Sequence, residues 1–165
     1  RAGAGQITLE PFTQATKFAP QMSTAQVALL LDHASAFNSP DWRSRQETAT
    51  VITDERDELC HITFRFRERS VSASAADFFE ALAQVRIQLE PDHLIPFCYG
   101  ASLNVFPSGM SRSMGSGLKA YRLTMKRQAL TKDLVFIFDS GPDVIPASVT
   151  RQKEYFDSWI ASLKV

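Results

Sequence analysis

Hydrophobic and polar residues alternate along the stretch 59–69, which is the period of a β-strand with one face in the core. The apolar positions are Cys60, Ile62, Phe64 and Phe66. The polar positions between them include Arg65 and Arg67, so a shift of the strand by one residue would bury these arginines. A β-branched stretch at 48–53 precedes it, and the charged turn between the two stretches predicts a hairpin.

Helical spacing marks three other stretches. One helix is predicted from Ser23 to about residue 37, because Ser23 and Gln26 have the spacing of a capping box and apolar residues recur at helical intervals after them. A second is predicted from near Ser74, with Asp77 close to its positive end, until Pro91 stops it. A third is predicted over 148–165, where the apolar residues form one stripe.

Further strands are predicted at 100–106, 118–126 and 134–139. The predicted order is therefore α-β-β-α-β-β-β-α. This order favours a single α+β domain over residues 23–165, with a mostly antiparallel sheet of about five strands packed with three helices. Three consecutive strands argue against a doubly wound nucleotide-binding fold. Residues 1–22, which are polar and punctuated by Pro11 and Pro20, are predicted to form an N-terminal arm.

The composition is that of an ordinary globular domain without a dominant charge. A chain of 165 residues with 44% hydrophobic residues is typical of one domain. Eighteen basic and eighteen acidic residues cancel, which argues against nucleic acid or an anionic membrane as the partner. No apolar stretch is long enough to span a membrane and no export pattern opens the chain, so a cytoplasmic protein is expected. Cys60 and Cys98 are expected to be buried, reduced thiols.

A stretch rich in glycine, serine and methionine lies between two predicted strands, at 107–117. Its small residues let the backbone approach a ligand and direct several N–H groups at one anion. The candidate binding residues are Ser108, Gly109, Ser111, Arg112, Ser113, Gly115, Ser116 and Gly117. The stretch is not a P-loop, because no Gly-Lys-Ser/Thr ends it and a strand is predicted after it. The alternative is a long mobile connection between two strands.

Positive charge is concentrated near this stretch. Between His93 and Lys132 the sequence contains no Asp or Glu. The basic residues there are Arg112, Lys119, Arg122, Lys126, Arg127 and Lys132. If two predicted strands present their arginines on the same side of one sheet, a basic row forms beside the 107–117 stretch, and its members are Arg65, Arg67, Arg122 and Lys126. The alternative is a solvated strand face whose arginines pair with nearby carboxylates.

The chain offers few groups for catalysis or metal binding. Its histidines lack H-x-x-x-H spacing and its cysteines lack C-x-x-C spacing, so no metal or cofactor site is predicted. Asp139, at the end of a predicted strand, and His93 are the candidates for an acid or a base. The alternative for Asp139 is a turn, in which its side chain accepts a hydrogen bond from the backbone of Gly141.

Two functions follow as hypotheses. The first is a non-enzymatic binding module, such as an adaptor, chaperone-like or inhibitor protein, which recognises an acidic protein partner or anionic surface through the basic row and the 107–117 stretch. The second is a small-molecule site or hydrolase, in which the same stretch holds a phosphate or carboxylate while Asp139 or His93 serves as acid or base. A deep pocket beside the stretch favours the second hypothesis, and a flat face with an apolar centre favours the first.

Overall fold

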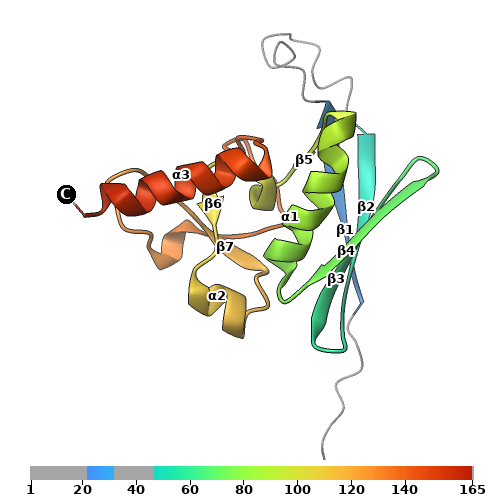
Figure 1. The fold of residues 1–165 in the computed structure, drawn as a ribbon, viewed down its shortest axis with the longest axis horizontal. Coiled ribbons are helices and arrows are strands. Elements are labelled where there is room, and N and C mark those ends of the chain that lie inside the picture. Colours follow the sequence, from blue (N-terminus) through green and yellow to red (C-terminus); the bar gives the residue numbers. More distant parts are fainter. Residues whose placement is uncertain (1–21, 32–46, 165) are drawn as a thin grey trace, which may run out of the picture.

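A computed structural model describes residues 22–31 and 47–164 of the chain. It confirms the predicted α+β class, with a curled antiparallel sheet of five strands, a smaller sheet of three strands and three α-helices (Figure 1). The predicted N-terminal arm lies outside the described residues, apart from Met22. None of the helices in the described ranges is long and apolar enough to cross a lipid bilayer.

The larger sheet has the strand order β4-β3-β2-β1-β5, and every neighbouring pair is antiparallel. Its strands are β1 (Ser23–Leu31), β2 (Glu47–Arg56), β3 (Leu59–Phe66), β4 (Arg69–Ala75) and β5 (Leu94–Phe97). The predicted hairpin is confirmed as β2 and β3. Its turn consists of Asp57 and Glu58, both at positive φ (52° and 62°), as the right-handed twist of a two-residue hairpin requires.

The alternation that predicted β3 matches the burial of its side chains. Ile62 and Phe64 are completely buried against the helix that covers this sheet, whereas Arg65 is exposed on the opposite face. Phe64 pairs across the sheet with Val51 on one side and with Val71 on the other. The period of two therefore fixed the register, because a slip by one residue would exchange the buried and exposed faces.

The helix predicted from Ser23 is wrong, because Ser23–Leu31 forms β1 in the interior of the larger sheet. Val27 is the cross-strand partner of Ala49 in β2, and Leu30 is the partner of Ile95 in β5. A short apolar run fits the period of a helix and of a buried strand equally well, so strand pairing on both sides decides the outcome. Residues 32–37 of the predicted helix lie outside the described residues.

Helix α1 (Phe78–Leu89) confirms the second predicted helix but begins later, because Ser74 belongs to β4. Asp77 is its N-cap, and the Asp77 side chain accepts a 2.8 Å hydrogen bond from the backbone N–H of Glu80. Helix α1 lies against the larger sheet, over β3 and β4 (Figure 1). The helix thereby separates this sheet from the rest of the domain.

The smaller sheet and the remaining helices lie on the other side of α1 (Figure 1). The sheet consists of β6 (Val105–Phe106), β7 (Lys119–Arg122) and β8 (Leu134–Phe136), all antiparallel. The predicted strands at 100–106, 118–126 and 134–139 are therefore shorter than expected. The first of them also contains a turn of 3₁₀-helix at Tyr99–Ala101. Helix α2 (Gly109–Met114) replaces part of the predicted connection, and α3 (Val149–Ser162) confirms the last predicted helix.

A chain of aromatic rings joins the two halves of the domain. Phe79 of α1 meets Phe106 of β6 edge to face at 5.2 Å between ring centroids. Phe106 stacks on Phe156 of α3 at 4.0 Å, and Phe156 lies 6.0 Å from Trp159 of the same helix. These contacts hold α3 against the smaller sheet. Aromatic pairs stabilise such packing beyond the contribution of burial alone.

Candidate functional site

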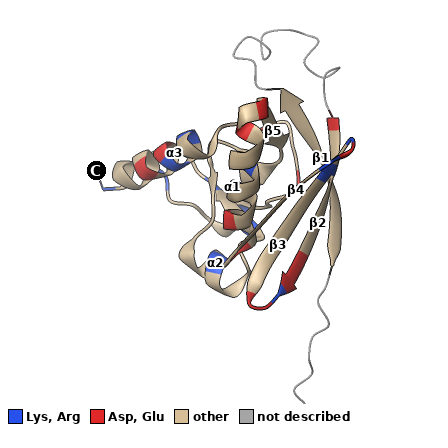
Figure 2. Ribbon diagram, turned by 45° about the vertical axis from the view of Figure 1, so that its right-hand side comes forward, with Lys and Arg blue, Asp and Glu red and all other residues tan. Residues whose placement is uncertain are grey.

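The predicted basic row does not form on one sheet. Arg65 and Arg67 belong to β3 and the turn after it in the larger sheet, whereas Arg122 belongs to β7 in the smaller one. Figure 2 shows the basic positions around the β3–β4 turn at the opposite end of the larger sheet from the basic position on α2. Arg67 also forms an ion pair with Glu47. The prediction depended on β3 and β7 sharing a sheet, and α1 lies between the two sheets instead.

The 107–117 segment is neither a bare glycine-rich loop nor a free connection, because it contains α2. Ser108 is the N-cap of α2 and its side chain accepts a 3.1 Å hydrogen bond from the backbone N–H of Ser111. Arg112 holds the helix against the start of α1. Its guanidinium donates to a carboxylate oxygen of Asp77 at 2.8 Å and to one of Glu80 at 3.0 Å. The positive charge of Arg112 is therefore already matched by two carboxylates.

The small residues at the end of this segment serve a close contact with α1. Gly117 has φ of 69°, and a Cβ atom there would lie 2.7 Å from Oδ1 of Asp77. The preceding carbonyl, of Ser116, accepts a 2.8 Å hydrogen bond from the N–H of Phe78. The N–H groups of Gly115 and Gly117 both donate to the carbonyl of Ser111. Two of the amides that were expected to face an anion are thus used inside the segment.

A pocket of about 510 Å³ lies between the start of this segment and α3. Ser108 and Gly109 border it, and four aromatic side chains form much of its wall, namely Phe106, Tyr121, Phe156 and Trp159. None of the described residues that line it carries a formal charge. Pockets of this size with an apolar lining and a few polar groups are typical ligand sites.

Hydrogen bonds from the indole N–H hold the tryptophan of the pocket wall in place. Nε1 of Trp159 donates to the backbone carbonyls of Thr124 (3.1 Å) and Arg127 (3.0 Å), which belong to the turn after β7. The backbone N–H of Lys126 in the same turn donates to Oγ of Ser162 in α3 at 2.9 Å. The turn and the helix thereby close one side of the pocket, while the indole ring borders its interior.

Two exposed lysines lie on the strand and the turn that also contribute pocket-lining residues, although neither lysine is itself part of the lining, and we call Lys119 and Lys126 the rim lysines. Lys119 lies two residues before Tyr121 on β7, so both side chains project from the same face of this strand. Lys126 lies in the turn that Trp159 holds. Both rim lysines are exposed, and neither forms an ion pair with another residue that the structure describes.

Arg122 projects from the opposite face of β7 and belongs to a different cluster. Its guanidinium donates to Asp143 at 2.7 Å, and the hydroxyl of Tyr99 donates to the other carboxylate oxygen at 2.7 Å. The hydrogen bonds from Tyr99 and Arg122 hold the pKa of Asp143 below its usual range. The hydrogen bond to Asp143 also raises the pKa of Tyr99. The cluster fixes the 139–146 segment rather than opening onto the pocket.

The two candidate acid–base residues do not line the pocket. Asp139 follows β8, and its backbone carbonyl accepts a 2.8 Å hydrogen bond from the N–H of Tyr99. His93 ends a turn of 3₁₀-helix, Glu90–Asp92, where it has φ of 56°. The structure thus places Ser108 and Gly109 in the wall of one hollow and carries the rim lysines on the strand and turn that supply other parts of that wall. Asp139 and His93 lie outside the wall.

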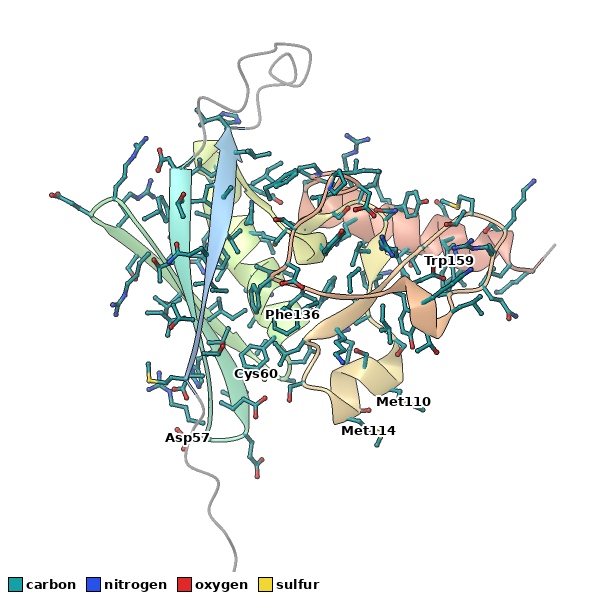
Figure 3. All side chains as sticks on the ribbon, turned by 180° about the vertical axis from the view of Figure 1, so that it is seen from behind. Asp57, Cys60, Met110, Met114, Phe136 and Trp159 are labelled. Carbon is teal, nitrogen blue, oxygen red and sulfur yellow. The ribbon has the colours of Figure 1, made fainter. Side chains whose placement is uncertain are left out.

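A second hollow, of about 420 Å³, lies beside the β2–β3 turn and is bordered by Glu55, Asp57, Glu58 and Cys60 (Figure 3). Burial, followed by the charge of Glu55, raises the pKa of Cys60 to about 11. Cys98 is completely buried, and burial raises its pKa to about 11 as well. Both cysteines are buried free thiols, as predicted. Within the described ranges no three His, Cys, Asp or Glu side chains are grouped so that they could hold a metal ion.

The pocket was not predicted from the sequence, although the apolar residues of α3 that line it form a recognisable pattern. The apolar stripe of the last helix predicts core packing for Phe156, Trp159 and Ile160, but Ile160 is 38% exposed and Phe156 is only half-buried. An apolar stripe wider than the core requires was therefore the available signal. No protein-family model matches the sequence, and a search of the curated proteins finds none similar to it.

Proposed function

We propose that this protein is a non-enzymatic binding module whose partner is a protein with an acidic surface segment. The binding surface consists of the pocket, the start of α2 at Ser108 and Gly109, and the rim lysines. The observation that carries the proposal is an uncharged aromatic pocket whose wall includes residues of the strand and turn that bear the two exposed rim lysines, for which the described residues supply no ion pair. This surface keeps the partner class expected from the sequence but replaces the row on one sheet by a smaller site.

The distribution of charge supports an acidic partner. The sequence contains no acidic residue between His93 and Lys132, so the pocket-lining segments within this interval contribute no negative charge. Helix α3, which completes the wall, carries Glu154 and Asp157 as well as Arg151 and Lys153. Arg112 forms ion pairs with Asp77 and Glu80, and Arg127 forms one with Asp133, all of which lie outside this interval. The rim lysines keep their charge available. Complementary charges at an interface rim mainly accelerate encounter and select the partner.

The position of the perturbed ionisable groups favours binding over catalysis. Enzymes usually gather such groups in the cleft where they act. The described residues with clearly shifted pKa values are Cys60, Arg86, Cys98, Tyr99, Arg122 and Asp143. None of them lines the aromatic pocket. A pocket lined by rings, a serine and an amide is suited to holding a group rather than to moving a proton.

A pocket beside the 107–117 segment is the feature that favours the second hypothesis from the sequence, so a small molecule is a further candidate. About 510 Å³ lies within the range of ligand cavities, roughly 300–1,000 Å³. Such a ligand would place an apolar body between the rings and a carboxylate or phosphate near the rim lysines. A thermal-shift screen of aromatic acids and aromatic phosphates tests this candidate, and a stabilising compound whose effect disappears when the pocket is filled would favour it.

Selection from a random peptide library on the immobilised protein tests the proposed function. We expect the enriched peptides to carry an excess of Asp and Glu, and we expect the double variant Lys119→Glu/Lys126→Glu to lose them. The matched control is Arg65→Glu/Arg151→Glu, which changes the net charge equally at two exposed positions away from the pocket lining. The proposal would be overturned if the enriched peptides carried no excess of Asp and Glu. It would also be overturned if the lysine double variant bound the enriched peptides as well as the arginine control does.

A further inference from the structure

We infer that the pocket receives an aromatic side chain of the partner, which acts as the anchor of the acidic segment. This inference rests on the proposed function and specifies its chemistry. The rim lysines define the charge of the ligand, whereas the pocket defines its uncharged part. The two features are separate observations, so each can be tested without the other.

The wall of the pocket is suited to a flat ring. Phe106 and Phe156 are stacked with nearly parallel planes, 16° apart, and this pair presents ring atoms to the hollow beside Trp159. Tyr121 and Gln128 also line the pocket, and their side chains carry a hydroxyl and an amide. Rings pack favourably on rings, and an indole N–H or a phenol O–H finds a hydrogen-bond partner among such polar groups.

The surroundings of the pocket favour a protein segment over a free small molecule. Met110 and Met114 stand on α2 one helical turn apart and are 72% and 82% exposed (Figure 3). Met110 directly follows Gly109, which borders the pocket. Methionine side chains adapt to varied apolar surfaces, so this face of α2 extends the contact beyond the pocket. We expect a peptide with its anchor in the pocket to contact the rim lysines and these methionines as well.

Gly109 offers a way to fill the pocket without disturbing the fold. A Cβ atom at Gly109 would meet no atom within 4 Å, and the residue is the first of α2, where backbone geometry tolerates side chains. The variant Gly109→Trp therefore places a large ring at the pocket border, and Gly109→Ala is its matched control. Unfolding curves of both variants serve as the check that the domain remains folded.

The experiment compares two short acidic peptides that differ at one position, with tryptophan at the centre of one and alanine at the centre of the other. Isothermal titration measures their affinities for the wild-type protein. We expect the tryptophan peptide to bind at least about tenfold more tightly, which corresponds to about 1.4 kcal/mol. Gly109→Trp should reduce this difference to less than about twofold, whereas Gly109→Ala should preserve it.

A spectroscopic readout locates the anchor. In ¹⁵N-labelled protein, the indole N–H signal of Trp159 is identified by its persistence in a Trp42→Phe variant. We expect this signal to shift with the tryptophan peptide and to remain in place with the alanine peptide. Because the peptides are unlabelled, their own tryptophan does not contribute to the spectrum.

The outcomes separate the inference from the proposed function. Equal affinities of the two peptides, both lost in Lys119→Glu/Lys126→Glu, would overturn the aromatic anchor and leave the acidic partner in place. A tryptophan preference that persists in a peptide without acidic residues, and in the lysine variant, would support the anchor and overturn the acidic partner. If neither peptide moves the Trp159 signal and neither binds, the inference is wrong.

Discussion

Nη1 of Arg86 donates a 2.5 Å hydrogen bond to Oε1 of Gln152, and both side chains are only 2% exposed. Arg86 belongs to α1 and Gln152 to α3, so the contact joins the two helices in the interior. The two side chains also donate to the backbone carbonyls of Gly100, Ser102, Val105 and Ala147. Burial lowers the pKa of Arg86 to about 10, which still leaves it charged at neutral pH. The two side chains thus supply hydrogen bonds to backbone carbonyls outside regular secondary structure, which would otherwise be buried without partners.

We expect Arg86→Met and Gln152→Leu each to lower the free energy of unfolding by about 2 to 4 kcal/mol, because each leaves the other side chain and several carbonyls buried without partners. The double variant should cost less than the sum of the two. Urea unfolding of the four proteins gives the coupling energy, which we expect to be at least about 0.5 kcal/mol. Strictly additive losses would show that the two side chains act independently.

The ion pairs of Arg112 determine how firmly α2 is held. We expect Arg112→Ala to lower the free energy of unfolding by about 1 kcal/mol, since Asp77 is buried while the Arg112 side chain is 34% exposed and partly screened. Amide hydrogen exchange over residues 108–117 should become faster at the same time. Arg65→Ala is the control, because Arg65 is exposed and its loss should change stability by less than about 0.5 kcal/mol. Unchanged exchange over the segment would contradict a clamping role for Arg112.

The sequence predicted the elements whose pattern is set by the core. The alternation at Ile62 and Phe64 fixed the register of β3. The second helix was predicted correctly as α1, but its start was placed near Ser74, and Asp77, expected only as a favourable charge, is its N-cap. The sequence-based prediction failed for strands whose structure depends on pairing with neighbouring strands. The apolar run of β1 has no period of its own, and β4 alternates only serine with small apolar residues, which is a weak strand signal.

The candidate site was predicted only in part. Ser108 and Gly109 line the pocket, and Lys119 and Lys126 lie on the strand and turn that also border it, but Arg65 and Arg67 lie in another sheet and the turn after its third strand. A single sequence indicates that a strand has an exposed face, and it does not say whether two strands share one sheet. It also cannot show that α3 extends beyond the core, which is why Phe156 and Trp159 were assigned to packing alone.

The buried thiol of Cys98 should make stability depend on pH in the alkaline range. Burial raises its pKa from 9.0 to about 11, so the folded state keeps the proton that the unfolded state loses. Its contribution to stability is complete below pH 9 and disappears as pH rises through about 11. We expect the wild-type protein to lose about 1 to 3 kcal/mol more than Cys98→Ala over this interval. Urea unfolding at several pH values measures the difference, which cancels contributions common to both proteins. Parallel curves would contradict it.

Substitution by alanine should affect the free energy of unfolding differently at Gly117 and at Gly109. We expect Gly117→Ala to lower the free energy of unfolding by about 1 to 3 kcal/mol, because φ of 69° disfavours a side chain and the new Cβ atom would lie 2.7 Å from Asp77.

Gly109→Ala meets open space at a helix start, and we expect it to be neutral or to stabilise the protein by up to about 1 kcal/mol. Thermal and urea unfolding of both variants measure the contrast. Equal effects would mean that the end of the 107–117 segment is not pressed against α1. In that case the close contact with Asp77 would not explain the glycine at position 117.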